Sequence, residues 1–295
     1  MELSVVILPI ERWSIAREQW RRLDEWGVHA GYVYDHLSWR EPFREGPWFA
    51  MVPTLVAAAG VTRRLRLGPL VTSPNFRHPL VLAKDLIALD DVSDGRLLVG
   101  VGSGGTGFDS HVLGQSPWSP LERHERFVEF TRALDRLLIE PASNLPGPHY
   151  PVVDSRQLPG PRQRPRPPLY LSAMGPKSLA LTAELAEGWV SYGARAGEAL
   201  STYDAVRNQV ARLDEELARR ERPSGAVRKL LLHFDGDEHP MASLEAFLDW
   251  AGRYREAGID EVVVHWPVAD TAFAGDPEVF EEICREGALA IAHWD

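Results

Sequence analysis

The chain has 295 residues, of which 44% are hydrophobic and 25% charged, and its formal net charge is −10. The apolar content is ordinary for a globular protein, and the acidic balance argues against general binding to nucleic acid or anionic membrane, because both require a basic face. Cys284 is the single cysteine, so no internal disulfide can form, which predicts a cytoplasmic protein. The apolar run at Ser4 is too short for a signal peptide or membrane-spanning helix and predicts a strand.

Short β-rich runs alternate with longer helical patterns along the rest of the chain. Eight strands are predicted to begin near Ser4, Ala30, Leu65, Arg96, Pro168, Gly188, Lys229 and Glu261. Helical patterns lie between and after them, at 11–26, 48–61, 79–92, 120–139, 175–187, 197–221, 242–257 and 276–291. Eight uninterrupted βα units predict a single (β/α)8 TIM barrel over residues 1–295. Residues 141–168 are rich in proline and are predicted to form an insertion segment between strand four's helix and strand five, packed over the barrel.

The fourth strand leads into glycines at Gly100, Gly102 and Gly105, in the spacing G-x-G-x-x-G. In a dinucleotide-binding fold those glycines turn directly into a helix, within the first βαβ unit. Here three strand–helix units precede the motif, and the next helix start is at Ser119, so the dinucleotide interpretation fails. A barrel instead places the glycines on its C-terminal rim, where active sites are built and where glycine lets backbone approach a flat ligand.

Histidines follow four of the predicted strands, at His36, His78, His233 and His265. A histidine titrates near neutral pH and can move protons, although a histidine at a strand end is often a hydrogen-bonded packing residue. We favour a functional role for His36 and leave the other three open.

These histidines, with Asp35 and Asp235, also allow a metal-dependent hydrolase barrel. Barrels of that class often carry an H-x-H pair on strand one, and strand one of this chain contains no histidine. Cysteine and histidine spacings typical of metal centres are missing from the sequence as well. We therefore predict no metal ligands and keep the hydrolase as an alternative.

The segment SAMGPKSL precedes the sixth helix by a glycine and a proline. Gly175 ends the loop, Pro176 is suited to the first helical position, and Lys177 and Ser178 follow. Free backbone N–H groups and a cation at a helix start can bind phosphate. A helix start with an exposed lysine is the alternative explanation.

Four stretches, in order and spacing, resemble the bacterial luciferase-like family of flavin (FMN) monooxygenases and deazaflavin-dependent oxidoreductases. They are YVYDHL, VTRRLRLGPLVTSPNFRHPLVLAKDLIALDDVSDGRLLVGVGSGG, HYPVVD and PRQRPRPPLYLSAMGPKSLALTAELAEGWV. The resemblance is close over residues 1–192 and covers the last third only in outline. It implies a (β/α)8 barrel that holds reduced FMN, or the 8-hydroxy-5-deazaflavin coenzyme F-420, in a rim pocket and acts on a small organic substrate.

The resemblance also implies roles for individual residues. Asp35 and His36 match the family's pair beside the flavin-type ring, with His36 as proton donor or substrate anchor. Leu70 and Val71 match a strand-three bulge behind the ring, which a cis peptide often joins. The loop beneath the ring and the phosphate region correspond to Gly102, Ser103, Gly104, Gly105, Gly175, Lys177 and Ser178.

Other features of the resemblance leave the choice of cofactor open. Many deazaflavin members have glutamate where Gly105 stands, whereas SPNFRHP is closer to deazaflavin relatives than to luciferase. Trp39, Trp118 and Trp266 are candidates for the substrate side of the pocket or for packing. We predict either oxygen activation for monooxygenation by reduced FMN or hydride delivery by reduced F-420. A barrel that binds a flavin without turnover is a further alternative.

The second predicted helix is apolar nearly all round. Its sequence from Trp48 is WFAMVPTLVAAA, in which Thr54 alone has a polar side chain. An outer barrel helix needs one apolar stripe, so a second face remains to be covered. We therefore predict a homodimer through the 48–61 region, which the resemblance also implies, and place Ala58 on the outer face. Cover by another segment of the same chain is the alternative.

Overall fold

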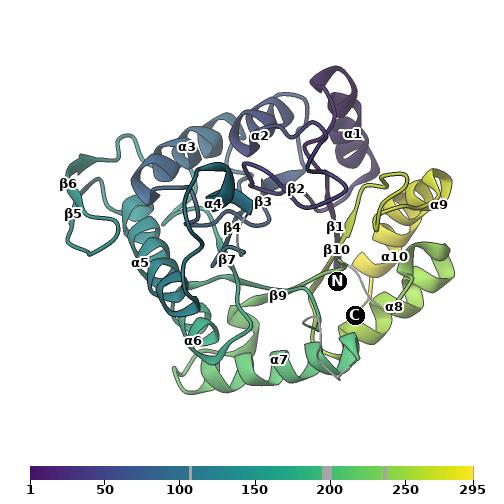
Figure 1. Cartoon of the computed structure of the whole chain (residues 1–295). Coiled ribbons are helices and arrows are strands. Elements are labelled where there is room, and N and C mark those ends of the chain that lie inside the picture. The colour runs from purple at the N-terminus through teal and green to yellow at the C-terminus, as the bar shows by residue number, and fades with distance from the viewer. Residues whose placement is uncertain (106–107, 195–200, 235–237, 295) are drawn as a thin grey trace.

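A computed structural model describes residues 1–105, 108–194, 201–234 and 238–294. Within those ranges, eight parallel strands form one sheet in the order β3-β2-β1-β10-β9-β8-β7-β4, and helices surround it (Figure 1). The strands are β1 (Glu2–Val6), β2 (Ala30–Val33), β3 (Arg66–Pro69), β4 (Val99–Gly102), β7 (Leu169–Ser172), β8 (Gly188–Ser191), β9 (Arg228–Leu232) and β10 (Glu261–His265). These eight strands are the ones expected from the sequence, and the barrel prediction is confirmed.

The helices agree with the expected pattern. They are α1 (Trp13–Trp26), α2 (Met51–Ala59), α3 (Pro79–Val92), α5 (Pro120–Ile139), α6 (Pro176–Leu185), α7 (Thr202–Ala218), α8 (Leu244–Glu256), α9 (Pro277–Glu282) and α10 (Ala288–Ala292), with a π-helical turn, η3 (Ile283–Gly287), between the last two. The start of the pattern at 197–221 lies outside the described residues. No helix in the described part of the chain is long and apolar enough to cross a membrane.

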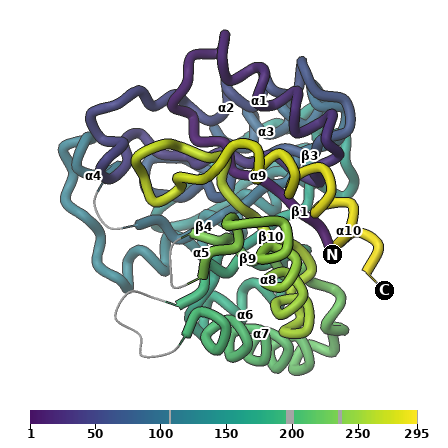
Figure 2. The backbone as a smooth tube through the Cα atoms, turned by 90° about the vertical axis from the view of Figure 1, so that its right-hand side faces the viewer, coloured from purple at the N-terminus to yellow at the C-terminus, as the bar shows by residue number. Residues whose placement is uncertain are grey.

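Several short elements were not expected. Helix α4 (Phe108–Val112) follows β4, and the strands β5 (Ala142–Leu145) and β6 (Val152–Arg156) form an antiparallel hairpin outside the barrel (Figure 1). Two short 3₁₀ turns, η1 (Ser224–Ala226) and η2 (Pro240–Ala242), flank β9. In the side view α4 lies at the end of the barrel opposite the chain termini (Figure 2).

The barrel closes between β3 and β4 through backbone hydrogen bonds on either side of a bulge. Leu98 N donates to Leu67 O at 2.9 Å, and Thr72 N donates to Gly100 O at 2.9 Å. Glycine is required where the two strands meet, because a Cβ at Gly68 would collide with the carbonyl of Leu98. The close contact brings the bulge after β3 against β4.

Alternate strand residues divide the core into two clusters. On β10, Val263 points into the barrel, whereas Val262 and Val264 pack against the surrounding helices. The inner cluster also includes Tyr32 and Tyr170. These two tyrosines and the three valines of β10 are each at least 96% buried. At roughly 25 cal/mol per Å² of apolar surface removed from water, these layers dominate the favourable free energy of folding.

The structure corrects the orientation expected for α2. Ala58 is fully buried against the barrel, and its carbonyl accepts a hydrogen bond from Thr62 Oγ1 at 2.9 Å. The outward side chains of this region are Phe49 and Val56, which are 41% and 36% exposed. A helix that is apolar on every side gives no sequence signal of which face points inward.

Candidate functional site

Asp35 lies directly beyond β2, and its buried carboxylate is paired twice. The side chain is 1% exposed and accepts hydrogen bonds from Arg77 Nη2 at 2.7 Å, Arg77 Nε at 3.0 Å and Thr72 Oγ1 at 2.6 Å. Burial tends to lower the pKa of Arg77, but the hydrogen bonds and charge of Asp35 raise it overall. The bidentate pair fixes the segment after β3 against the end of β2.

His36 is the next residue, and a buried carboxylate from α4 holds its ring. The Nδ1 atom of His36 lies 3.0 Å from Oδ2 of Asp109, whose side chain is 1% exposed, while the His36 side chain is 23% exposed. The other carboxylate oxygen, Oδ1, accepts a hydrogen bond from Leu37 N at 2.8 Å. A proton on Nδ1 that faces Asp109 leaves Nε2 to exchange a proton with a ligand.

Aromatic rings pack beside His36. Trp39 is 6% exposed and stacks on His36 with ring centroids 6.3 Å apart. On its other sides Trp39 contacts Phe43, Trp48 and Phe273, at centroid distances of 5.0, 5.4 and 6.1 Å. These rings form an aromatic cluster on one side of the imidazole.

The glycine loop after β4 lies against the bulge after β3. A Cβ on Gly102 would lie 2.6 Å from Cγ2 of Val71, and Gly104 has a φ of +77° with Asn75 against it. The peptide between Leu70 and Val71 is cis, which is the geometry that the resemblance implies. Ser103 is half-buried, and Gly105 is exposed with no described heavy atom within 4 Å of a built Cβ. The loop is thus packed against the bulge and is exposed at Gly105.

The segment before α6 leaves the barrel next to that loop, because Ser172 pairs with Gly102. Gly175 is the N-cap of α6 and provides no side-chain cap, so the first backbone N–H groups, at Lys177 and Ser178, lie at an uncapped helix start. The pKa of His124 on α5 is lowered, mainly by burial and to a smaller extent by the positive charge of Lys177. Lys177 and the start of α6 thus lie at the same rim as the glycine loop.

Two of the candidate tryptophans have other contacts. Trp118 stands before α5, with the Arg126 guanidinium 4.2 Å from its ring centroid. Trp266 stacks on Trp26 at 5.8 Å and contacts Phe280 edge-on at 5.0 Å. Since Trp26 and Phe280 belong to α1 and α9, Trp266 packs between the barrel and its outer helices.

The remaining histidines differ in environment. His78 caps α3, where its Nδ1 accepts a hydrogen bond from Leu80 N at 3.2 Å. His265 is 6% exposed, and its Nε2 lies 2.6 Å from the hydroxyl oxygen of Tyr34. Burial lowers the pKa of His265 to about 3, with a smaller contribution from His233, so His265 is neutral at physiological pH.

Asp235 lies outside the described residues. Within the described ranges, no group of three or more His, Cys, Asp or Glu side chains is arranged to hold a metal ion.

Four polar residues of the site were missed from the sequence: Asp109, Arg77, Thr72 and Asn75. Thr72, Asn75 and Arg77 lie in the loop after β3, within the stretch TSPNFRHP. Polar residues in a loop on the barrel rim are candidates for a functional site, so the position of this loop could have identified them. Asp109 had no such signal, because it pairs with a residue 73 positions away.

In a comparison with known families, the model described as luciferase-like monooxygenase matches residues 4–258. Among curated proteins, the chain is similar to the F420-dependent glucose-6-phosphate dehydrogenase of Amycolatopsis mediterranei (strain U-32). The two are 31% identical over 172 residues, which are 57% of this chain and 50% of that protein. The chain thus spans about half the length of this relative.

Solved structures share the fold. The coenzyme F420 dependent tetrahydromethanopterin reductase from Methanopyrus kandleri superposes with a TM-score of 0.76 at 16% identity, covering 97% of both chains. A monooxygenase, RslO1, from Streptomyces bottropensis superposes with a TM-score of 0.78 at 19% identity, covering 100% of both chains. At identities of 16% and 19%, the similarity shows that the chains share the barrel fold, and it does not show that they share a reaction.

Proposed function

Since the chain belongs to the luciferase-like monooxygenase family, we propose that it is an oxidoreductase that uses reduced coenzyme F-420 to transfer hydride to a small organic substrate. The observation that carries this proposal is the His36–Asp109 pair, at the rim beside the glycine loop and the cis peptide. The F420-dependent relatives at about 30% identity favour the deazaflavin over FMN.

The glycine loop is packed against the bulge after β3. The side chains of Val71 and Asn75 fill the space that a Cβ would take at Gly102 and Gly104, whereas a Cβ at Gly105 would meet nothing within 4 Å. A flat ring could therefore approach the backbone at Gly105, with the bulge at Leu70 and Val71 behind the loop. This fit, together with the family, supports assigning the ring site to these residues.

The start of α6 fits the phosphate of such a cofactor. Gly175 has open space around a built Cβ, and Lys177 and Ser178 supply N–H groups at the positive end of the helix dipole. Lys177 adds a full charge at the same place. We assign these three residues to phosphate binding.

When bound in its reduced form, the deazaflavin supplies hydride, and the chain supplies position and a proton. His36 presents Nε2 to the substrate oxygen, while Asp109 fixes the tautomer and ring plane through Nδ1. The Asp35–Arg77 pair keeps the segments after β2 and β3 in register, and the rings around Trp39 pack beside the imidazole. Asp35 therefore acts on the cofactor site indirectly.

Turnover under two regimes tests the proposal. Reduced F-420 should be oxidised anaerobically by the protein in the presence of a panel of carbonyl compounds, as followed by its absorbance. Reduced FMN under oxygen is the second candidate reaction, because the family is described by monooxygenation. If product forms only with reduced FMN and oxygen, the protein is a monooxygenase and not an F-420-dependent enzyme. Cofactor binding without either reaction would indicate a flavin-binding barrel without turnover.

We also propose that the protein is a homodimer of the cytoplasm. Phe49 and Val56 extend the apolar surface of the α2 region outward, which supports a second copy packed there. Cys284 is buried and alone, which is consistent with a reducing compartment.

A further inference from the structure

Asn75 stands in the loop after β3, between the glycine loop and the His36–Asp109 pair. Its Nδ2 atom donates to Oδ2 of Asp109 at 3.4 Å and to the carbonyl oxygen of Gly105 at 3.5 Å. Oδ2 of Asp109 is also the atom that lies 3.0 Å from Nδ1 of His36. One amide group therefore contacts both the loop assigned to the cofactor ring and the carboxylate that holds the proposed proton donor.

The neighbouring groups determine which way the Asn75 amide faces. A carbonyl oxygen and a carboxylate oxygen accept hydrogen bonds, so the amide nitrogen faces them and the amide oxygen is turned away. The amide oxygen lies over Gly104, where an added Cβ would collide with it. The glycine at 104, whose φ is +77°, thus leaves the space that the Asn75 side chain occupies.

The importance of Asn75 comes from what its contacts connect. Each contact is longer than the usual N–H···O distance of about 2.9–3.0 Å, so neither is strong by itself. The Asp109 carboxylate accepts hydrogen bonds from Leu37 N at 2.8 Å and from Asn75, and it also faces His36. Leu37 and His36 follow β2, whereas Asn75 follows β3. Asn75 therefore holds the carboxylate from a second direction.

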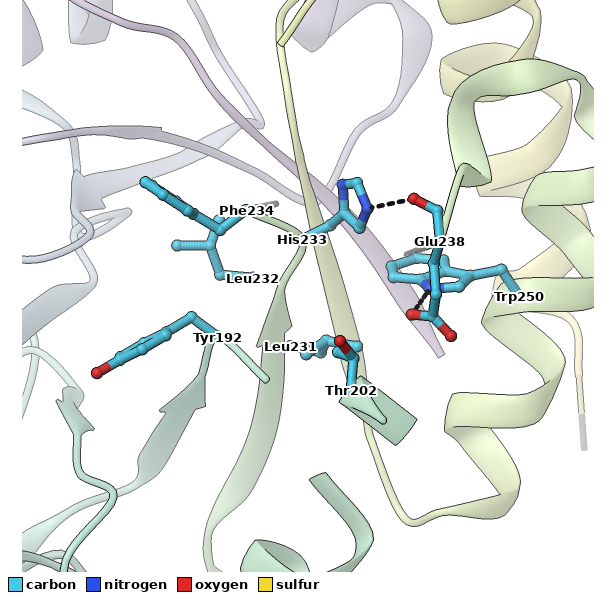
Figure 3. A pocket seen from close by; sticks show the side chains of 8 residues that line it. All are labelled: Tyr192, Thr202, Leu231, Leu232, His233, Phe234, Glu238 and Trp250. Carbon is cyan, nitrogen blue, oxygen red and sulfur yellow. Dashed lines mark hydrogen bonds between the residues drawn. The ribbon is translucent and has the colours of Figure 1, made fainter. Parts of the chain in front are cut away.

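His233, which follows β9, has a different kind of partner. Its Nε2 atom lies 3.2 Å from the carbonyl oxygen of Glu238, five residues further along the chain (Figure 3). A backbone carbonyl is fixed by the chain that carries it, whereas a side-chain carboxylate can turn unless other groups hold it. A third residue therefore has a role at His36, and His233 provides an internal reference for experiments on His36.

We propose that Asn75 is a positioning residue, which holds the Asp109 carboxylate against His36 and fixes this pair relative to the glycine loop. The inference rests on the proposed function, because the proton donor and the cofactor ring must keep a set distance for that reaction. Small displacements of reacting groups are costly, since about 1 Å can lower a rate roughly 100-fold. Asn75 acts on the reaction through Asp109 and the loop.

The tautomer of His36 in the cofactor-free protein tests this role apart from turnover. Long-range ¹H–¹⁵N NMR at about pH 8.5, above the ordinary histidine pKa of roughly 6.5, distinguishes a proton on Nδ1 from one on Nε2. The parent should show the Nδ1-protonated form. Asn75→Ala removes the donor, and Asn75→Asp keeps the side-chain shape but places a second carboxylate beside Asp109. Both variants should lose the single tautomer, and the loss should be larger in Asn75→Asp.

Two controls accompany these spectra. Asn208→Asp makes the same chemical change at an exposed position on α7 and should leave the His36 signals as they are in the parent. The His233 signals should stay unchanged in every variant, which also shows that the fold is kept. A parent protein with the Nε2-protonated form, or a His36 tautomer that is the same in the parent and in both Asn75 variants, would overturn the inference.

Turnover separates positioning from packing. If Asn75 only fills the space over Gly104, the isosteric Asn75→Asp variant should react as the parent does. We expect instead that its kcat with reduced F-420 falls roughly tenfold or more, while F-420 affinity changes by less than about threefold. Asn75→Ala combined with Asp109→Asn should be no slower than Asp109→Asn alone, because Asn75 acts through that carboxylate. A loss confined to F-420 affinity would overturn the inference.

The two kinds of measurement also separate this inference from the proposed function. If the parent does not turn over with F-420 but the His36 tautomer responds to Asn75 as expected, the proposed function alone fails. If the parent turns over with F-420 but neither the tautomer nor kcat responds to Asn75→Asp, the role of Asn75 alone fails.

Discussion

The Nδ1 atom of His36 and the Oδ2 atom of Asp109 lie 3.0 Å apart, although one residue follows β2 and the other stands on α4 beyond β4. The carboxylate is almost fully buried and the imidazole is partly exposed. Such a pair orients the ring and favours one tautomer, which is how a histidine is prepared to transfer a proton from its other nitrogen.

Replacing His36 removes the proposed proton donor. His36→Asn should lower turnover by roughly 10²–10⁴-fold, the usual contribution of general acid catalysis, while F-420 affinity changes much less. Single-turnover absorbance and an equilibrium titration measure the two quantities. Equal rates in the variant and the parent would remove His36 from the reaction.

Replacing Asp109 tests whether the carboxylate positions the histidine. Asp109→Asn should lower turnover by roughly 10- to 100-fold, because a hydrogen bond to a charged group contributes about 1.5–3 kcal/mol. Asp91→Asn, at an exposed position on α3, is the control and should leave turnover unchanged. The double variant with His36→Asn should be no slower than His36→Asn alone; additive losses would show that Asp109 acts elsewhere.

The phosphate assignment predicts a loss of cofactor affinity. Lys177→Ala should weaken F-420 binding by roughly 1–2 kcal/mol through loss of a charge-assisted hydrogen bond. Arg212→Ala removes an exposed cation from α7 and serves as the control. Affinity that stays the same in Lys177→Ala would place the phosphate elsewhere.

The Asp35–Arg77 pair should matter for stability. Arg77→Met leaves the buried Asp35 carboxylate without its cation, so the free energy of unfolding in urea should fall by about 3–5 kcal/mol. Arg156→Ala breaks the exposed pair with Asp154 and should change it by less than about 1 kcal/mol. Similar small losses in both variants would contradict a buried charge pair.

His265 should make the fold sensitive to acid. Its folded pKa, about 3, lies below the unfolded value of 6.5, so the unfolded chain binds the proton more readily between these limits. The contribution to stability is complete above about pH 6.5 and is lost as the pH falls toward 3. His265→Gln should therefore lose less unfolding free energy than the parent between pH 7 and pH 5, measured by urea denaturation. An unchanged pH dependence would argue against a buried neutral imidazole.

Sequence patterns predicted the barrel because they report local preferences. The helix start expected at Ser119 is confirmed: the Ser119 side chain caps α5 by accepting a hydrogen bond from Glu122 N, and Pro120 occupies the first turn. Helix α4 has five residues, too few to show a helical period, and was missed. Ala58 was misplaced because the sequence of α2 lacks a polar face.

The candidate site was predictable only where it follows strand ends. His36 and the glycine loop stand at such positions, and a barrel brings them to one rim. Asp109 and Asp35 each pair with a residue that is distant in the sequence. The Asp109–His36 and Arg77–Asp35 pairs form only in the folded chain, so they could not be predicted from residue spacing. Trp266 resembles Trp39 in sequence terms, yet packs outside the barrel.

Direct titration of the purified protein with F-420 and with FMN, followed by absorbance and by quenching of tryptophan fluorescence, tests the central claim. We predict saturable, stoichiometric F-420 binding that is weakened in Lys177→Ala, and much weaker binding of FMN. Tight FMN binding with no response to F-420, or no response to either, would contradict the account.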